Sequence, residues 1–242
     1  MPADEPPAEP SDAALPPHAP WRLAGEAVVG WVRASGRPRR SPGLPAELQP
    51  SIGRAMVIAV RYVDSPVGPY DELTVAVPAR VGLRPGLASI ISVVSQPMAR
   101  RGGQRNWGFP AELGTLRWSA DGPARSMHWE ERGVEVVGVP FGPTLPFLVP
   151  MRSVQLRSDG PVVVPRRLWG LLRLSRVAVS VPEGDPLTWA AGCHIGAHLA
   201  NMRMLVHPAR HPIGLLSSLR APLGPPEPAL AQSHYSDHAS GA

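Results

Sequence analysis

The 242-residue sequence contains no lysine, so all 24 of its basic side chains belong to arginine. Its load of alanine, proline, glycine and arginine is typical of a GC-rich coding sequence, which explains the absence without reference to function. The chemical consequence is the same whatever the cause. No side chain carries a primary amine, and this excludes a lysine Schiff base and any other reaction that depends on a tunable lysine amine.

Cysteine is nearly absent too, because Cys193 is the only one in the chain. A single cysteine excludes an intramolecular disulfide and is typical of a reducing cytoplasm. The sequence has no apolar run near the roughly eighteen residues of a membrane span, and its acidic, proline-rich start lacks the features of a signal peptide. We therefore expect a soluble cytoplasmic protein without a membrane partner.

Acidic residues are fewer than basic ones, which gives a formal net charge of +5. Such a charge makes nucleic acid or another polyanion a possible partner. The basic pairs Arg39-Arg40, Arg100-Arg101 and Arg166-Arg167 are scattered among acids, however, and no nucleic-acid recognition motif accompanies them. We expect these pairs to lie on a solvated surface, and anion or nucleic-acid binding stays a minor alternative.

Proline and glycine are abundant, at 32 and 24 residues, and the prolines cluster at both ends of the chain and between short apolar runs. This pattern favours many short strands joined by turns over a helical protein. Residues 1–20 and 223–242 lack a hydrophobic period and are predicted to be disordered tails. Between them, residues 21–222 are enough for one domain with a hydrophobic core.

Period-two alternation and short apolar runs predict about ten strands. The segment 187–206 fits either a helix or a strand, and we favour a strand from about Gly196. So many strands in one domain require closure or stacking to protect their edges. We predict a mainly β fold with minor α, in which antiparallel sheets close into a cone or barrel around an internal pocket. The other strands are expected at residues 26–33, 55–63, 72–79, 87–94, 125–131, 134–139, 147–156, 162–164 and 171–181.

Two common site types find little support in the sequence. On a helix, His194 and His198 would share a face as in part of a zinc site, but no HExxH or paired-cysteine motif accompanies them, and a strand would break this spacing. Ser92 and Ser95 lack the Gly-x-Ser-x-Gly elbow of a serine hydrolase. We expect neither a bound metal nor a cofactor.

The least generic stretch is 95–118, where a Gly102-Gly103 pair predicts a turn and residues 111–113 a short helix. The arginines around the glycine pair have two interpretations. They form either an anion-binding nest or a solvated loop or subunit contact. These arginines are Arg100, Arg101 and Arg105.

Three segments carry a resemblance to a known family: Pro20-Trp21-Arg22, the run 67–72 with sequence VGPYDE, and the run 103–114 with its Phe-Pro step. In this order and spacing they resemble the acetoacetate decarboxylase family, over about residues 21–222. The resemblance implies a closed, cone-like β fold with an internal pocket, and a homo-oligomer.

The resemblance also implies a set of active-site positions, several of which are changed here. Glu72 matches the family's catalytic glutamate. The Schiff-base lysine and the second lysine that lowers its pKa correspond to Ala111 and Glu112, a further glutamate to Val57, and an arginine of the first strand to Glu26. Alanine cannot attack a carbonyl, so decarboxylation through a lysine iminium is excluded.

Other side chains are expected to line the pocket instead. Phe109 and Pro110 would form a wall, and Ala111 would leave extra room. Since alternate residues of a strand share a face, Arg61 faces the pocket if Val57 does, as the resemblance implies. We hypothesise that Arg61 lies near Glu72 as an ion pair or a carboxylate-binding fork; the alternative is an arginine that points to solvent.

Two functions follow from these positions. The first is a pseudoenzyme or ligand-binding protein that holds a small organic or keto acid in the pocket. The second is a lyase, isomerase or hydratase that needs no lysine, with Glu72 as general acid or base and arginine to polarise the substrate. In either case Arg105 is a further candidate for ligand binding.

Overall fold

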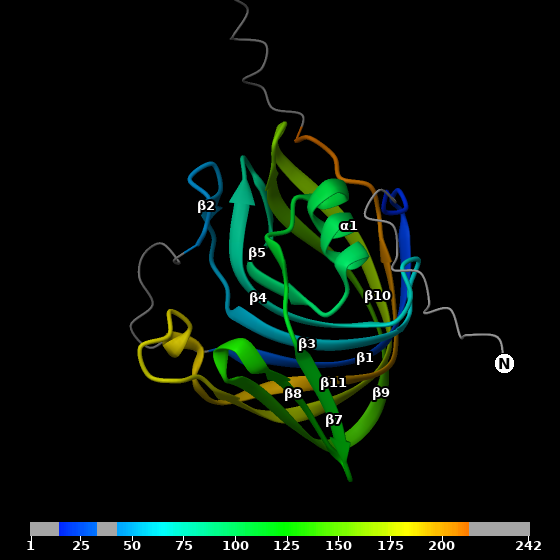
Figure 1. Ribbon diagram of the computed structural model, residues 1–242, viewed down its shortest axis with the longest axis vertical. Coiled ribbons are helices and arrows are strands. Elements are labelled where there is room, and N and C mark those ends of the chain that lie inside the picture. Colours follow the sequence, from blue (N-terminus) through cyan, green and yellow to red (C-terminus); the bar gives the residue numbers. More distant parts are fainter. Residues whose placement is uncertain (1–14, 33–42, 213–242) are drawn as a thin grey trace, which may run out of the picture. The chain divides into compact units, whose positions relative to one another are not determined.

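The structure is a computed structural model that describes residues 15–32 and 43–212 (Figure 1). These residues form one sheet of eleven strands and one α-helix. The predicted tail 223–242, residues 1–14 and the Arg39-Arg40 pair lie outside the described residues. The elements are β1 (Trp21–Val32), β2 (Gln49–Pro50), β3 (Ala55–Asp64), β4 (Tyr70–Val81), β5 (Arg84–Val94), α1 (Pro97–Trp107), β6 (Ala111–Leu113), β7 (Leu116–Asp121), β8 (Ala124–Trp129), β9 (Val134–Arg157), β10 (Gly160–Ser180) and β11 (Gly192–Val206), with 3-10 turns at Glu130–Arg132 and Thr188–Ala190.

Hydrogen bonding closes part of the sheet into a ring. The neighbours in order are β5, β4, β3, β1, β11, β10 and β9, and Leu87 of β5 pairs with Ser153 of β9 to complete the circuit. That junction is parallel and short, so the ring is not a strict barrel. The prediction of a mainly β fold with a ring-like closure is confirmed, although one continuous sheet replaces the several sheets that we expected.

The strands β9 and β10 are much longer than predicted, because the prolines of β9 do not interrupt it. Over residues 139–152, β10 is the only described strand that pairs with β9, so the other edge of β9 is free. Pro146 and Pro150 are four residues apart, so their nitrogens point to the same edge. Both prolines remain paired with β10, so their nitrogens point to the free edge of β9. A missing N–H costs nothing at this edge, and it discourages pairing with a strand of another chain.

The strand assignment of the ambiguous C-terminal segment is confirmed, since β11 runs through Gly196. Two local predictions in 95–118 are wrong. Residues 111–113 form β6, which pairs in parallel with β5, and the Gly102-Gly103 pair lies inside α1. Glycine costs about 1 kcal/mol in a helix interior, so this pair suggested a turn.

Capping at both ends explains why α1 forms despite its glycines. The side chain of Gln96 accepts a hydrogen bond from the Ala99 N–H at 2.7 Å, and Pro97 follows at the first helical position. At the other end Gly108 adopts the left-handed conformation, with φ of 72°, and its N–H donates to the Gln104 carbonyl. Within the described ranges no helix is long and apolar enough to cross a membrane.

The sheet buries a core on each of its faces. Figure 1 shows α1 within the curve of the sheet, and on this side Trp21, Trp107 and Met204 belong to one apolar cluster. On the opposite face, Val57 and Met127 belong to a second cluster that includes residues of β7 and β8. Which face a side chain occupies therefore decides whether it can reach the inside of the ring.

The start of the described chain packs against α1. The Trp21 indole and the Asn106 amide both donate to the Pro17 carbonyl, at 3.0 and 2.9 Å. Pro16 is buried. Residues 15–20, which we predicted to be part of the N-terminal tail, thus contact the folded domain.

The two helix glycines give a matched test of this packing. A Cβ added to Gly102 would overlap the Trp21 ring, whereas one added to Gly103 would meet Ala111 and Phe109 at an ordinary 3.6 and 3.7 Å. Gly103→Ala should therefore stabilise the protein by up to about 1 kcal/mol through helix propensity. Gly102→Ala should destabilise it by about 1–3 kcal/mol through overpacking. Chemical denaturation measures both, and equal effects would contradict the described helix orientation.

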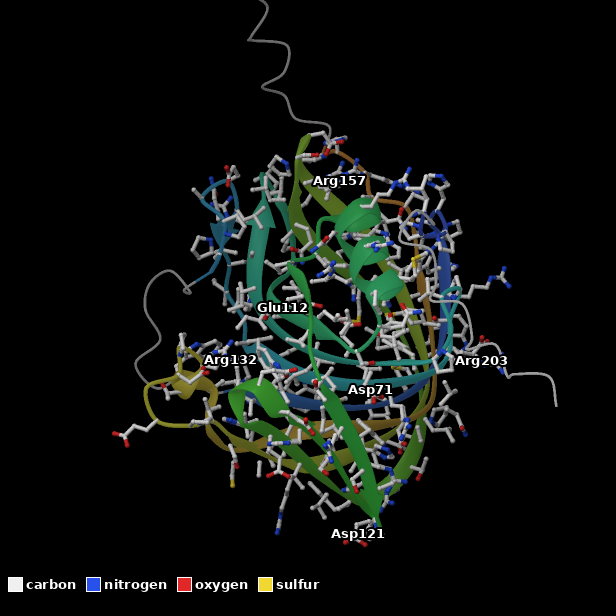
Figure 2. The ribbon with its side chains drawn as sticks, in the orientation of Figure 1. Asp71, Glu112, Asp121, Arg132, Arg157 and Arg203 are labelled. Atoms are coloured by element: carbon white, nitrogen blue, oxygen red, sulfur yellow. The ribbon has the colours of Figure 1, made fainter. Side chains whose placement is uncertain are left out.

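A second prediction concerns the contact between the 3-10 turn at Glu130–Arg132 and the loop 181–187. Arg132, labelled in Figure 2, donates through Nε to Asp185 at 2.7 Å, and the Leu187 N–H donates to the same carboxylate at 2.7 Å. Burial acts to raise the pKa of Asp185, but these hydrogen bonds and the Arg132 charge lower it overall. A folded pKa below the unfolded one gives stability that is present at neutral pH and is lost as the pH falls through the folded pKa.

Asp185→Asn should cost about 1 kcal/mol at neutral pH, and the difference from the native protein should shrink as the pH falls below the ordinary carboxyl pKa of about 4 and Asp185 becomes protonated. Unfolding free energies measured across this pH range test it. The exposed Asp121→Asn serves as control and should leave the curve unchanged. A cost for Asp185→Asn that is independent of pH would contradict the role of the carboxylate charge.

Candidate active site

Inside the ring, on the face that α1 covers, lies a mainly apolar space of about 200 Å³ that we call the ring cavity. All seven strands of the ring contribute to its wall. Its polar lining groups are few: Tyr62, Glu72, Thr74, Ser89 and Arg166. The apolar lining residues are Ala27, Val29, Trp31, Met56, Ile58, Val60, Phe147, Val149, Met151, Leu168, Leu172, Ala197, Leu199, Met202 and Met204.

A second, much smaller space of about 30 Å³ lies between the ring and α1, and we call it the helix-side chamber. It has room for roughly one water molecule. Phe109 and Ala111 line it together with Trp107. Four residues line both spaces and so mark the junction between them: Tyr62, Glu72, Arg166 and Met204.

The Glu72 carboxylate is held at this junction by hydroxyl groups. Oε1 accepts from Thr74 Oγ1 at 2.8 Å and from Ser92 Oγ at 3.3 Å, and the Tyr62 hydroxyl donates to the same side chain. Thr74 follows Glu72 by two residues and lies on the same face of β4. Ser92 of β5 is the ladder partner of Thr74. Donors from three neighbouring strands thus fix the carboxylate oxygens, which act only as acceptors when ionised.

Arg166 is the functional candidate that sequence reasoning missed. Its side chain extends from β10 into the junction, where the guanidinium carbon lies 4.7 Å from the centre of the Phe109 ring. Its Nε is buried and has no hydrogen-bond partner among residues 15–32 and 43–212. Burial lowers the pKa of Arg166, while Tyr62, Glu72 and Tyr70 oppose this shift.

A signal for Arg166 was present in the sequence. Residues 164 and 168 are Val and Leu and share a strand face with it, so period two places this arginine on an apolar, inward face. We assigned the Arg166-Arg167 pair to the surface as a unit, which holds only for the exposed Arg167.

Some of the other predicted residues line the two spaces or an outer cleft, and the rest lie outside all three. Glu72, Phe109 and Ala111 meet at the helix-side chamber, and Ala111 is 4% exposed. The prediction of extra room beside Ala111 is wrong, because the chamber is small and aromatic rings line it. Glu112, labelled in Figure 2, lies on β6 with an exposed side chain and lines neither space.

The predicted pocket positions of Val57 and Arg61 are wrong. Arg61 is 51% exposed, and its Nε lies 3.8 Å from Asp71. In the ladder between β3 and β4, Val60 is the residue opposite Glu72, and Val60 and Tyr62 face the cavity. Alternation therefore turns Arg61 and Val57 to the opposite face, where Val57 is buried in the second core.

The same alternation directs Glu26 away from the cavity. Its Oε1 accepts from Arg125 Nε at 2.6 Å and lies 2.6 Å from His198 Nε2. His194 Nε2 lies 3.0 Å from the Ala190 carbonyl. Over the described ranges no three His, Cys, Asp or Glu side chains are placed to hold a metal ion.

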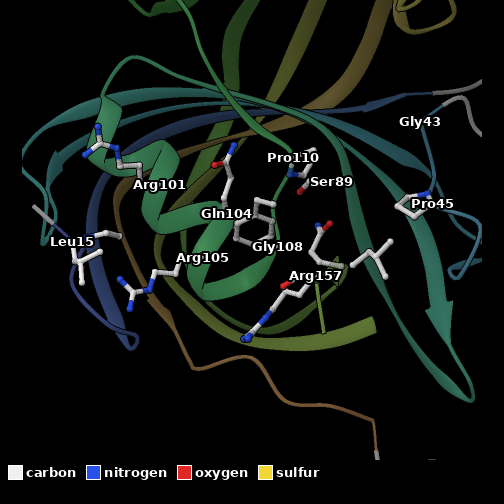
Figure 3. Close-up of a pocket in the computed structure, with 15 residues that line it drawn as sticks. Leu15, Gly43, Pro45, Ser89, Arg101, Gln104, Arg105, Gly108, Pro110 and Arg157 are labelled. Atoms are coloured by element: carbon white, nitrogen blue, oxygen red, sulfur yellow. The ribbon is translucent and has the colours of Figure 1, made fainter. Parts of the chain in front are cut away.

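Pro110 and Arg105 line an outer cleft of about 730 Å³ beside α1 (Figure 3). Arg101 lies one helical turn before Arg105 and lines the same cleft, as does Arg157 of β9. The glycine pair lies inside α1 and forms no turn, so of the two interpretations of Arg100, Arg101 and Arg105 the anion-binding nest is wrong. Phe109 lines both the cleft and the helix-side chamber, and is the wall between them.

The sequence model of the acetoacetate decarboxylase (ADC) family matches residues 7–172. This chain belongs to that family. No curated protein matches the chain by sequence.

Solved structures with the same fold include three ADC-like proteins. The enduracididine biosynthesis enzyme MppR complexed with pyruvate has a TM-score of 0.63 and 16% identity, and covers 82% of this chain and 92% of its own. An acetoacetate decarboxylase-like enzyme from Sphingomonas wittichii RW1 has a TM-score of 0.63 and 14% identity, and the match covers 82% of this chain and 95% of that enzyme. The acetoacetate decarboxylase from Legionella pneumophila has a TM-score of 0.56 and 15% identity, and the match covers 84% of this chain and 91% of that enzyme.

The two tyrosines beside Glu72 provide a prediction about the electrostatics of the site. The rings of Tyr62 and Tyr70 lie 4.7 Å apart. Burial, and then the Glu72 charge, raises the pKa of Tyr62 well above its usual range; burial, Tyr62 and Glu72 raise that of Tyr70. Neither side chain should ionise in the folded protein at about pH 10, where an ordinary tyrosine is half ionised.

Replacing both residues, Tyr62→Phe with Tyr70→Phe, should therefore leave the tyrosinate absorbance of the folded protein between about pH 9 and 11 unchanged. Circular dichroism at each pH confirms that the fold persists. A loss of absorbance amplitude in the double variant would show that these hydroxyls titrate normally and are not buried beside a carboxylate.

Proposed function

We propose that this ADC family member binds a small organic acid, keto acids included, in the ring cavity without forming a covalent bond to it. The observation that carries the proposal is the junction, where Glu72 and Arg166 are the charged side chains that line an otherwise largely apolar space. Binding sites are commonly apolar cavities with a few convergent polar groups. The similar structure of MppR holds pyruvate, which supports an acid as the ligand here.

Ala111 supports a non-covalent role. It stands where the family resemblance implies the Schiff-base lysine, beside Glu72 and one residue after Pro110. The sequence offers no other lysine that could replace it. Without an amine nucleophile, the chain retains the pocket and loses the step that forms an iminium.

An enzymatic role is the second candidate, and the environment of Glu72 favours it. A carboxylate that three hydroxyl groups hold in one place can act as a general acid or base toward a ligand in the same cavity. Arg166 could polarise a carbonyl or carboxylate nearby. A lyase, isomerase or hydratase reaction would use these two groups.

We further propose that the protein is a cytoplasmic homo-oligomer. Exposed apolar side chains gather on the long pair β9 and β10, including Leu145, Leu148 and Leu174 at 55%, 72% and 42% exposure. Patches of this kind usually mark interfaces between proteins. Sedimentation at several concentrations tests this proposal, and a strictly monomeric protein would refute it.

Calorimetry and thermal melting of the full chain with pyruvate, acetoacetate and longer acids test the function. Saturable binding and a rise in Tm are expected, because a ligand at a hundred times its Kd adds about 2.7 kcal/mol of stability. Glu72→Gln should bind acids several-fold more tightly, since it removes a negative charge beside the ligand's carboxylate.

The exposed Glu183→Gln is the matched control, which should bind like the native protein. Product analysis on the same samples separates the two candidate functions. Turnover that Glu72→Gln abolishes would establish the enzymatic role, and the absence of binding to any acid would refute the proposal.

A further inference from the structure

The ring cavity is divided chemically along its length. Its charged groups, Glu72 and Arg166, lie at one end, at the junction with the helix-side chamber. The remainder of the wall is made almost wholly of aliphatic, methionine and aromatic side chains. A ligand that matches this wall has one polar end and one apolar end.

We propose that the ligand is an amphipathic monocarboxylate, whose carboxylate lies against Arg166 and whose apolar body fills the ring cavity. The proposal rests on the function proposed above and narrows its ligand class. It assigns to Arg166 the selection of the charged end, and to the cavity the selection of the apolar body.

Arg166 is built to receive an anion. Its backbone is paired on both sides, with Met151 of β9 and Val206 of β11, so the side chain is anchored within the sheet. Phe109 covers one face of the guanidinium at 4.7 Å from the ring centre, which leaves the N–H edge for a partner. No group in the described part of the chain forms a hydrogen bond with the buried Nε. A guanidinium edge matches the two oxygens of a carboxylate.

Glu72 does not supply that partner. Among the described residues, no carboxylate oxygen lies within 4.0 Å of the Arg166 guanidinium, and Glu72 Oε1 accepts from hydroxyl groups instead. An unpaired charge in a buried place is costly, and the cost falls when an anion binds beside it. Glu72 lines the same junction, and its negative charge favours a ligand with one carboxylate there over a ligand with two.

The apolar part of the cavity sets the size of the ligand's body. Its 200 Å³ corresponds to about six or seven water-sized groups. Methionines stand at four lining positions, Met56, Met151, Met202 and Met204. Their flexible thioethers adapt to bodies of different shape. A short polar keto acid would leave most of this wall without a partner.

The test is calorimetry of the full chain with a series of straight-chain carboxylates from acetate to octanoate, with pyruvate and acetoacetate, and with the amides of the same chains. Affinity for the acids should rise about fourfold per added methylene, the equivalent of about 0.8 kcal/mol, until the cavity is full. Each amide should bind at least tenfold more weakly than its acid. Affinity that does not depend on chain length would overturn the proposal.

Arg166→Gln should remove the preference for acid over amide while keeping the dependence on chain length. If that variant does not fold, Arg166→Met provides the same comparison with an apolar side chain of similar length. Arg203→Gln is the control: Arg203 lies on β11 between two cavity methionines but is exposed, as Figure 2 shows, and its removal should change neither ratio. A preference for acids that survives in both Arg166 variants would also overturn the proposal.

Two failures are distinguishable. If pyruvate and acetoacetate bind as tightly as octanoate and Arg166→Gln binds them equally well, the amphipathic ligand is wrong and the proposed acid-binding function stands. If no acid of any length binds, the proposed function itself fails.

Discussion

The closure of the sheet between β5 and β9 is the constraint on which the rest of the structure depends. Once Leu87 pairs with Ser153, each strand of the ring has one face toward α1 and one face away from it. Side chains that alternate along a strand are then committed to different surroundings. Glu72 and Arg166 come from strands far apart in the ring and meet inside it. Arg61 pairs with the neighbour of Glu72, and Glu26 is next to the residue that pairs with Tyr62, yet both side chains point away from the cavity.

This constraint explains which sequence predictions hold. Alternation in residues 55–63 and 72–79 defined β3 and β4 well, and the resemblance to the acetoacetate decarboxylase family grouped Phe109 and Ala111 with Glu72, which line one chamber. Local patterns could not say which face of a strand points inward, so Val57 and Arg61 were assigned to the wrong side. The helix was missed because its caps, Gln96 and Gly108, act through hydrogen bonds that outweigh the low propensity of two glycines.

Ala111, which the family resemblance aligns with the Schiff-base lysine, lines the chamber beside α1. There the methyl group of Ala111 and the rings of Trp107 and Phe109 leave space for about one water. The larger space lies on the other side of Glu72 and Arg166 and is apolar. We therefore propose that the ligand's body lies in the ring and away from Ala111, with the two charged side chains at the boundary.

The central claim is that an acid binds in this cavity without a covalent bond to the protein. Borohydride reduction of the chain at saturating acetoacetate or pyruvate, followed by peptide mass analysis, tests it most directly. We predict that binding measured on the same sample is saturable and reversible, and that no side chain of the cavity carries a reduced adduct. A reduced adduct on a cavity residue would contradict the account.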